Sequence, residues 1–177
     1  MSDFPLPALT LVLGGAASGK SAFAERLVVQ TGRPRVYLAT AQAYDAEMVA
    51  KVAAHQSQRG VGWHTIEAPH DIATPLANAA ANQIVLLDCA TLWLSNALLA
   101  NVPATDAVNN FVNAIAARTT PLVIVSNEVG AGIVPENALA RAFRNAQGGL
   151  NQAVAARADL AVNVIAGLPM VLKGRLE

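Results

Sequence analysis

Residues 14–21 have the composition and spacing of a phosphate-binding loop. They read Gly-Gly-Ala-Ala-Ser-Gly-Lys-Ser and match the G-x-x-x-x-G-K-[ST] pattern in full. Glycines let backbone N–H groups converge on phosphate oxygens, and the N-terminus of a following helix adds positive charge. Lys20 is expected to reach the β- and γ-phosphates, and the Ser21 hydroxyl to bind Mg²⁺. The loop therefore predicts a nucleoside triphosphate site.

The neighbouring residues give this loop the context that the motif requires. An apolar run at residues 9–13 precedes it, and Phe23 and Leu27 follow at helical spacing. A strand, a glycine-rich loop and a helix in this order are the structural context in which the motif forms a phosphate site. The alternative is an ordinary glycine-rich turn, which does not account for Lys20 and Ser21 after the last glycine.

A second acidic element is expected beside the loop. Residues 84–87 form a continuous apolar run that ends at Asp88. In a sheet of parallel strands this carboxylate lies at the same edge as the phosphate loop, where it can bind Mg²⁺. A turn role is the alternative, since many strands end in Asp. The adjacent Cys89 is interpreted as a small buried hydrophobic residue.

A histidine in the middle of the chain could act as a nucleophile. Met48, Val52 and His55 share one face of a predicted helix. His55 could equally be a core histidine with a satisfied ring nitrogen. Lys51 and Arg59 lie four residues to either side of it. Such cations would lower the pKa of the imidazole, keep it neutral, and pair with phosphate oxygens.

Polar side chains also follow other predicted strands. Thr40 and Gln42 come after the apolar run at 36–39, at the expected ligand edge of the sheet. Glu67 ends an alternating segment at 63–67. It could accept hydrogen bonds from a base edge or be a solvated charge, and the spacing is compatible with both.

The segment after residues 122–126 has its own polar pair. Asn127 and Glu128 could position substrate or Mg²⁺-bound water, or they could serve only in capping and turn formation. Arg141 and Arg144 are expected on the helix that follows. They are candidates for phosphate contact or for solvated charges.

Short apolar runs alternate with helical patterns along the chain. The runs are typical of strands buried on both faces, and the alternation predicts a three-layer α/β domain of the P-loop NTPase type with a mostly parallel sheet. We expect one domain over residues 1–177. The expected strands are 9–13, 36–39, 84–87, 122–126 and 161–165, and residues 170–172 could add an edge strand. The expected helices are 20–30, 45–57, 75–81, 92–100, 107–118 and 136–156, the last starting at Pro135-Glu136.

Composition and charge argue against several other classes of protein. Hydrophobic residues make up 54% of the chain and charged residues 14%, with 12 basic and 12 acidic side chains. No basic stripe suggests a nucleic-acid partner. No apolar segment reaches about 18 residues, so no membrane span is expected, and the first residues lack the features of a signal peptide. A single cysteine excludes an internal disulfide. We expect a cytoplasmic protein with a sizeable core or subunit interface.

The chain resembles the bifunctional adenosylcobinamide kinase/adenosylcobinamide-phosphate guanylyltransferases of cobalamin biosynthesis. The resemblance covers residues 11–173 and rests on the loop at 14–21 and on three further blocks at 37–69, 86–96 and 126–159. The last block contains the run Asn-Glu-Val-Gly-x-Gly-Ile-Val-Pro. This run is highly specific, because ordinary P-loop kinases lack it.

In that family a histidine carries a covalent GMP, and the aligned residue here is His55. The resemblance also implies that the nucleotides are GTP and ATP and that the metal is Mg²⁺. The implied substrates are adenosylcobinamide and adenosylcobinamide phosphate, and the implied assembly is a homotrimer. His55 and Lys20 are the expected catalytic residues, and Ser21 and Asp88 the expected metal ligands. The expected nucleotide contacts are Gly14, Gly15, Ala16, Ala17, Ser18, Gly19, Lys20, Ser21, Thr40, Gln56, Ser57, Gln58, Arg59, Glu67 and Asp88.

The implied mechanism has two steps. The loop, Lys20 and Mg²⁺ would position a γ-phosphoryl group for transfer to the hydroxyl of the cobinamide aminopropanol arm. Neutral His55 would attack the α-phosphorus of GTP, and the phosphoramidate would pass GMP to adenosylcobinamide phosphate. Two other functions stay open: a small-molecule kinase in which His55 is structural, and a nucleotide-dependent switch that uses the loop from Gly130 to Gly132. One departure from the family is Lys51, where many relatives have arginine, and this change does not replace a proposed catalytic residue.

Overall fold

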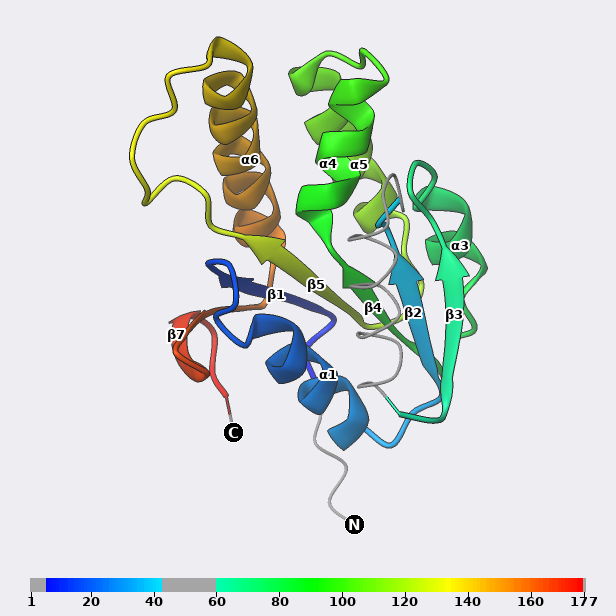
Figure 1. The fold of residues 1–177 in the computed structure, drawn as a ribbon. Coiled ribbons are helices and arrows are strands. Elements are labelled where there is room, and N and C mark those ends of the chain that lie inside the picture. Colours follow the sequence, from blue (N-terminus) through cyan, green and yellow to red (C-terminus); the bar gives the residue numbers. More distant parts are fainter. Residues whose placement is uncertain (1–5, 43–59, 177) are drawn as a thin grey trace.

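The computed structural model describes residues 6–42 and 60–176. The predicted helix at 45–57, which contains His55, lies outside these residues. Within them, strands and helices alternate as expected (Figure 1). The strands are β1 (Leu9–Gly14), β2 (Arg35–Ala39), β3 (Trp63–Glu67), β4 (Ile84–Asp88), β5 (Leu122–Asn127), β6 (Leu160–Ile165) and β7 (Leu168–Lys173). The helices are α1 (Lys20–Gln30), α3 (Ala73–Asn78), α4 (Ala90–Leu99), α5 (Ala104–Ala116) and α6 (Ala138–Arg157).

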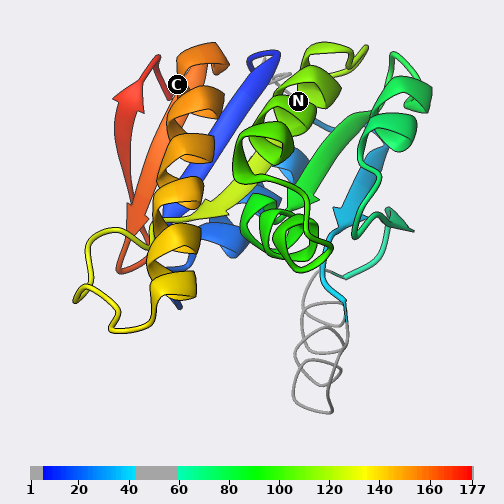
Figure 2. The same ribbon diagram turned by 90° about the horizontal axis from the view of Figure 1, so that it is seen from above.

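The strands form one seven-stranded sheet in the order β3-β2-β4-β5-β1-β6-β7. All neighbouring pairs are parallel except β6 and β7, which are antiparallel. The alternating segment at 63–67 forms β3, and residues 170–172, which could add an edge strand, lie within β7. Figure 2 shows β7 at the outer edge of the sheet beside β6. The mostly parallel, three-layer prediction is confirmed.

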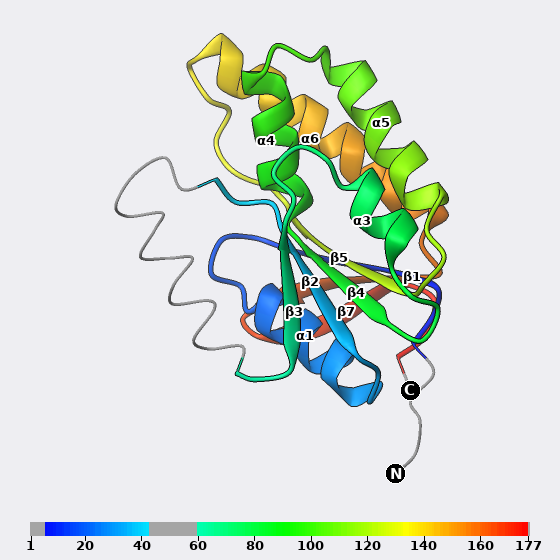
Figure 3. The ribbon, with the colours of Figure 1, turned by 90° about the vertical axis from the view of Figure 1, so that its right-hand side faces the viewer.

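Helices cover both faces of the sheet, so the domain has two cores (Figure 3). On one face α1 packs through Phe23 and Leu27 against alternate strand residues. On the other face α3, α4, α5 and α6 enclose a larger core that includes Phe111 and Leu150. Because both faces are buried, the strands read as continuous apolar runs, and this is why the sequence located them well. No helix among the described residues is long and apolar enough to cross a membrane.

The starts of four helices differ from the sequence expectation, and α4 begins at Ala90 rather than residue 92. Helix α3 begins at Ala73 rather than residue 75, because the Asp71 carboxylate accepts from the N–H groups of Ala73 and Thr74. Helix α6 begins at Ala138, and the expected start at Pro135-Glu136 was wrong. The Asn137 side chain accepts from two N–H groups of the first turn and caps the helix there.

Helix α5 starts at Ala104 rather than residue 107. Pro103 precedes it with a φ of −56° and a ψ of 139°, so the helix starts immediately after the proline. The apolar periodicity that guided the expectation begins only at Ala107, which is fully buried, whereas the residues of the first turn are exposed.

Candidate nucleotide-binding site

The phosphate loop leaves the end of β1 and enters α1, as the motif requires (Figure 1). Gly19 has a φ of 89° and Ala17 a φ of 54°, both in the left-handed region. A Cβ on Gly14 would lie 2.8 Å from the Val164 carbonyl oxygen, so only glycine fits at the end of β1. A hollow of about 350 Å³ lies against the end of this loop and the first residues of α1. The hollow is lined by Ala17, Ser18, Gly19, Lys20, Ser21, Ala22 and Glu25.

Lys20 is folded back over its own loop. Its Nζ donates to the Gly15 carbonyl oxygen at 3.0 Å. The side chain is half-buried, and both it and Ser21 line the hollow at the N-terminus of α1. A cation, a hydroxyl and a helix N-terminus therefore converge on one small space, which is the arrangement that binds phosphate groups.

A contact from the far end of the chain braces this loop. The Gly167 N–H, in the turn between β6 and β7, donates to the Ser18 carbonyl oxygen at 2.8 Å. A Cβ on Gly19 would lie 3.1 Å from the Gly167 Cα. The two backbones thus meet closely, and the sequence analysis did not anticipate the contact. Ala166 and Gly167 form this turn with φ values of 52° and 78°, and in the sequence Gly167 is a local signal for it.

Asp88 ends β4 at the same edge of the sheet. Its carboxylate accepts a hydrogen bond from the Tyr37 hydroxyl at 3.1 Å. Asp88 pairs in register with Ala39, and Ala39 pairs with Glu67 on β3. Asp88 and Glu67 are therefore two strand spacings apart, about 10 Å. Glu67 is exposed. A base contact by Glu67 stays a prediction.

Thr40 connects the ends of β2 and β4. It is fully buried, and its hydroxyl both donates to the Cys89 carbonyl oxygen and accepts from the Cys89 N–H, each at 2.7 Å. Asn96 on α4 donates to the Thr40 carbonyl oxygen at 2.9 Å. With its hydroxyl committed in this way, Thr40 aligns the edge beside Asp88. Its direct contact with nucleotide stays a prediction that this geometry does not favour.

Cys89 is inert in this setting. Burial, and secondarily the negative charge of Asp88, raises the pKa of its thiol to about 12. The thiol therefore keeps its proton at neutral pH and is a poor nucleophile. This agrees with the interpretation of Cys89 as a small buried hydrophobic residue.

The end of β5 is held on both sides by buried polar groups. The Thr91 hydroxyl accepts from the Asn127 N–H at 2.8 Å, and the Asn151 amide donates to the Asn127 carbonyl oxygen at 3.0 Å. The Glu128 N–H donates to the Gly14 carbonyl oxygen at 3.0 Å, so the strand end adjoins the phosphate loop. The Glu128 carboxylate accepts from the Gly130 N–H, which is the turn role that the sequence left open.

The side chains of Arg141 and Arg144 form hydrogen bonds with the loop before α6. Arg141 donates to the Pro135 carbonyl oxygen at 3.0 Å, and Arg144 donates to the carbonyl oxygens of Gly130 and Gly132. Both guanidinium groups are therefore engaged by backbone oxygens, and a phosphate contact by either would have to compete with these bonds.

Several predicted site residues lie outside the part that the structure describes. They are His55, Gln56, Ser57, Gln58 and Arg59. Among the described residues, the structure brings the phosphate loop, Asp88, Thr40 and Glu67 to one edge of the sheet.

The donors of the two predicted metal ligands suit Mg²⁺. Ser21 offers a hydroxyl oxygen and Asp88 a carboxylate, and Mg²⁺ is usually bound by one or two such oxygens together with phosphates and water. Over residues 6–42 and 60–176, no group of three or more His, Cys, Asp or Glu side chains is arranged to hold a metal ion.

Comparison with known proteins agrees with this geometry. Residues 10–172 match the family described as cobinamide kinase / cobinamide phosphate guanyltransferase. The bifunctional adenosylcobalamin biosynthesis protein CobP of Pseudomonas aeruginosa is 42% identical over 93% of this chain and 96% of its own length. The corresponding CobU protein of Salmonella typhimurium is 37% identical over 93% of this chain and 99% of its own length.

The fold is also found in a distant solved structure. An ATPase from the type III secretion system of pathogenic bacteria superposes with a TM-score of 0.54 at 10% identity, over 93% of this chain and 56% of that one. This likeness concerns the fold alone. The family match and the two relatives go further, and the chain belongs to the cobinamide kinase / cobinamide phosphate guanyltransferase family.

Proposed function

We propose that this chain phosphorylates adenosylcobinamide with a nucleoside triphosphate and then transfers GMP from GTP to the product, giving adenosylcobinamide-GDP. The observation that carries the proposal is the complete phosphate loop at the same sheet edge as Asp88, with β5 between their two strands, in a member of this family. Bound Mg²⁺ would neutralise charge on the phosphates, with Ser21 and Asp88 as its ligands.

In the kinase step the chain mainly binds and orients. The hydroxyl oxygen of the aminopropanol arm forms a bond to the γ-phosphorus, the bond to the β-phosphate oxygen breaks, and the hydroxyl proton is released. Lys20 and the loop N–H groups stabilise the charge on the transferred group and on the leaving diphosphate. For Lys20 this means exchanging the Gly15 carbonyl oxygen for phosphate oxygens.

In the transferase step His55 is the proposed nucleophile. A neutral ring nitrogen attacks the α-phosphorus of GTP, and pyrophosphate leaves. A phosphate oxygen of adenosylcobinamide phosphate then attacks the same phosphorus, and the phosphorus–nitrogen bond breaks. Gln56, Ser57, Gln58, Arg59 and Glu67 are the proposed nucleotide contacts of this step. The position of Glu67, about 10 Å from Asp88 along the sheet edge, supports a base contact.

We further propose a homotrimer. The outer strand β7 supports association between copies, because Leu168, Met170, Val171 and Leu172 are 71%, 48%, 42% and 54% exposed. An exposed apolar edge strand is a liability for a monomer. Light scattering coupled to size exclusion tests the stoichiometry, and a monomeric mass at working concentration would refute it.

A labelled-nucleotide assay tests the two activities together. GTP labelled at the α-phosphate should label the protein, and γ-labelled nucleotide should label adenosylcobinamide. A γ-label on cobinamide without any α-label on the protein would reduce the proposal to a kinase. Tight nucleotide binding with transfer of neither label would favour a nucleotide-dependent switch.

A further inference from the structure

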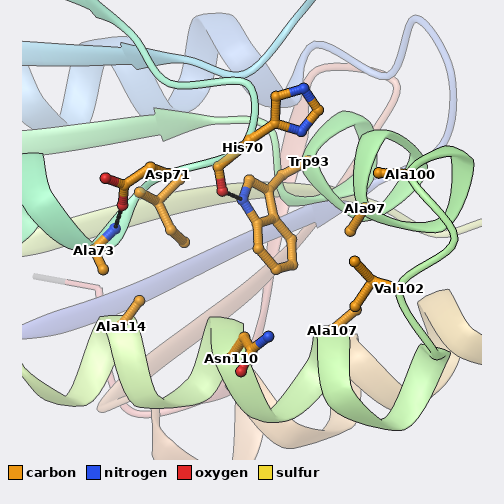
Figure 4. Close-up of a pocket in the computed structure, with 11 residues that line it drawn as sticks. His70, Asp71, Ala73, Trp93, Ala97, Ala100, Val102, Ala107, Asn110 and Ala114 are labelled. Carbon is orange, nitrogen blue, oxygen red and sulfur yellow. Dashed lines mark hydrogen bonds between the residues drawn. The ribbon is translucent and has the colours of Figure 1, made fainter.

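A half-open cavity of about 470 Å³ lies on the helical face away from α1 (Figure 4). Its walls come from α4, α5 and the segment that leads from β3 into α3. It is lined by His70, Asp71, Ile72, Ala73, Trp93, Ala97, Ala100, Val102, Ala107, Asn110 and Ala114. None of these residues belongs to the phosphate loop.

The cavity exists because small side chains face one another across two helices. Ala97 on α4 and Ala107 on α5 line the same space with Val102 between them, and the Trp93 indole forms the neighbouring wall (Figure 4). Trp93 is only 5% exposed and is held in place, since its Nε1 donates to the His70 carbonyl oxygen at 2.9 Å. Packed interiors leave few voids larger than a water molecule. An apolar opening of this size with a rigid aromatic wall is a ligand-type cavity.

Polar groups lie around the apolar surface. Asp71 is exposed, and the side-chain and backbone hydrogen bonds from Thr74 hold the pKa of its carboxyl below the usual value, so it is charged at neutral pH. Asn110 is exposed, and its side chain makes no hydrogen bond within the part of the chain described. A ligand with apolar edges and amide groups would be complementary to this combination.

The cavity is coupled to the nucleotide edge of the sheet. The His70 Nε2 lies 3.0 Å from the Gln42 amide nitrogen, at the end of β2. Asn96, on the same helix as Trp93, donates to the carbonyl oxygens of Thr40 and Pro69 at 2.9 and 3.0 Å. The wall of the cavity and the edge that contains Asp88 therefore share a set of hydrogen bonds.

We propose that this cavity receives one edge of the corrin macrocycle of the acceptor substrate, an inference that rests on the proposed function. A corrin is fringed with methyl and carboxamide groups. The methyl groups would pack against Trp93 and the alanines. The N–H groups of one corrin carboxamide would donate hydrogen bonds to Asp71. The Asn110 side chain would form amide–amide hydrogen bonds with a second carboxamide of the corrin. Entry by one edge leaves the aminopropanol arm outside the cavity, free to reach the triphosphate.

The test fills the cavity without touching the phosphate loop. Ala97→Leu adds bulk at a position that lines the cavity, and Asn110→Ala removes the amide. We expect Ala97→Leu to weaken binding of adenosylcobinamide, measured by calorimetry, by about tenfold or more, which is ~1.4 kcal/mol. Asn110→Ala should weaken it by a smaller factor. Affinity for GTP should stay unchanged in both variants. Ala116→Leu, at an exposed position of α5 that does not line the cavity, is the matched control for the added bulk and should behave as wild type.

The outcomes separate this inference from the proposed function. If the wild type neither binds nor phosphorylates adenosylcobinamide, the proposed function fails and this inference with it. If the wild type binds and a folded Ala97→Leu binds equally well, only the cavity assignment fails. If Ala97→Leu does not fold, amide hydrogen exchange of the wild type tests the cavity assignment instead. Adenosylcobinamide should slow exchange in the segment 93–110, and unchanged exchange there would overturn the assignment.

Discussion

Tyr37 donates a hydrogen bond to Asp88, with 3.1 Å between the hydroxyl oxygen and Oδ2. Tyr37 is 5% exposed and its ring meets Trp63 edge-on at 6.0 Å between centroids, so the hydroxyl is held in place. We expect Tyr37→Phe to leave Asp88 less well oriented for Mg²⁺. Nucleotide affinity in the presence of Mg²⁺ should fall by about 3- to 10-fold, the worth of one hydrogen bond.

The comparison with Asp88→Asn sharpens this prediction. Asp88→Asn removes the charge, so it should weaken Mg²⁺-dependent nucleotide binding more than Tyr37→Phe does. In EDTA both variants should bind nucleotide as the wild type does. An equal loss with and without Mg²⁺ would assign Asp88 to a base or ribose contact instead.

A second prediction concerns Lys20. Lys20→Ala should lower triphosphate affinity by about 10- to 100-fold, since hydrogen bonds to charged groups are worth ~1.5–3 kcal/mol. Kinase turnover should be largely lost. Thermal unfolding should change little, because the bond that the Lys20 side chain makes within the described residues is to the Gly15 carbonyl oxygen of its own loop. Calorimetry with a non-hydrolysable triphosphate measures the first effect.

Lys173→Ala is the matched control for Lys20→Ala. Its Nζ donates to the carbonyl oxygens of Ala155 and Ala156 at the end of α6, away from the loop, and its loss changes the net charge equally. It should leave nucleotide affinity unchanged. Normal triphosphate affinity and turnover in Lys20→Ala would contradict the phosphate-loop assignment.

The sequence predicted those strands, helices and site residues that depend on a local pattern of residue types. Strand β1 and helix α1 appear within one residue of their expected bounds, because an apolar run buried on both faces and a phosphate-loop motif are local signals. The same applies to Asp88 at the end of β4. The helix starts at Ala73 and Ala138 were missed because the caps Asp71 and Asn137 competed with nearby prolines as start signals.

Contacts between distant parts of the chain could not be predicted. Tyr37 and Asp88 are 51 residues apart, and nothing in their spacing indicates that they meet. The bond between Gly167 and Ser18 joins a C-terminal hairpin to the phosphate loop and depends on β6 lying next to β1. Such pairs follow from strand order. A single sequence does not specify strand order, so the bracing of the site appears only in three dimensions.

The stability of the protein should depend on Cys89 in alkaline solution. The unfolded thiol titrates near its ordinary value of 9.0, whereas the folded thiol has a pKa of about 12. Between these values the unfolded state binds fewer protons than the folded state, so the free energy of unfolding falls as pH rises from about 9 to about 12. Urea unfolding at several pH values should show a shallower fall in Cys89→Ala than in the wild type.

Alkylation provides an independent check on Cys89. At pH 8 the native thiol should react slowly with iodoacetamide, because it is buried and protonated, and should react quickly in denaturing urea. Rapid alkylation of the native protein, or an identical alkaline fall in Cys89→Ala, would show that the thiol is not held in its neutral form.

Asn151 should be important for stability. Its side chain accepts from the Ser126 hydroxyl at 2.6 Å and from the Gln147 amide at 2.9 Å, and donates to the Asn127 carbonyl oxygen. Gln147 and Ser126 are at most 1% exposed. Asn151→Ala leaves their polar groups short of partners, and we expect a loss of about 2 kcal/mol in the free energy of unfolding.

Gln152→Ala is the control for the Asn151 prediction. Gln152 is the exposed neighbour on α6, and its replacement should change the free energy of unfolding by less than about 0.5 kcal/mol. Urea denaturation of both variants makes the comparison. If Asn151→Ala were no more destabilising than Gln152→Ala, the buried amide network would have no net stabilising role.

The last prediction separates the two proposed chemistries through His55. His55→Ala should abolish guanylyl transfer and leave substantial kinase activity, because γ-phosphoryl transfer uses the loop and Lys20 rather than this imidazole. The wild-type adduct from α-labelled GTP should be labile in acid and stable in alkali, as expected for a phosphorus–nitrogen bond. It should form faster as pH rises through the titration of the ring, since only the neutral imidazole is a nucleophile.

The other two histidines provide the controls for His55. His64 is exposed on the edge strand β3, and the ring of His70 contacts Gln42. His64→Ala and His70→Ala should therefore retain the α-labelled adduct. An adduct that persists in His55→Ala and disappears in one of these two would assign the nucleophile there. Equal loss of both activities in His55→Ala, with a lowered melting temperature, would make His55 a core residue. Adduct loss with kinase turnover and melting temperature intact is the result that only a nucleophilic His55 explains.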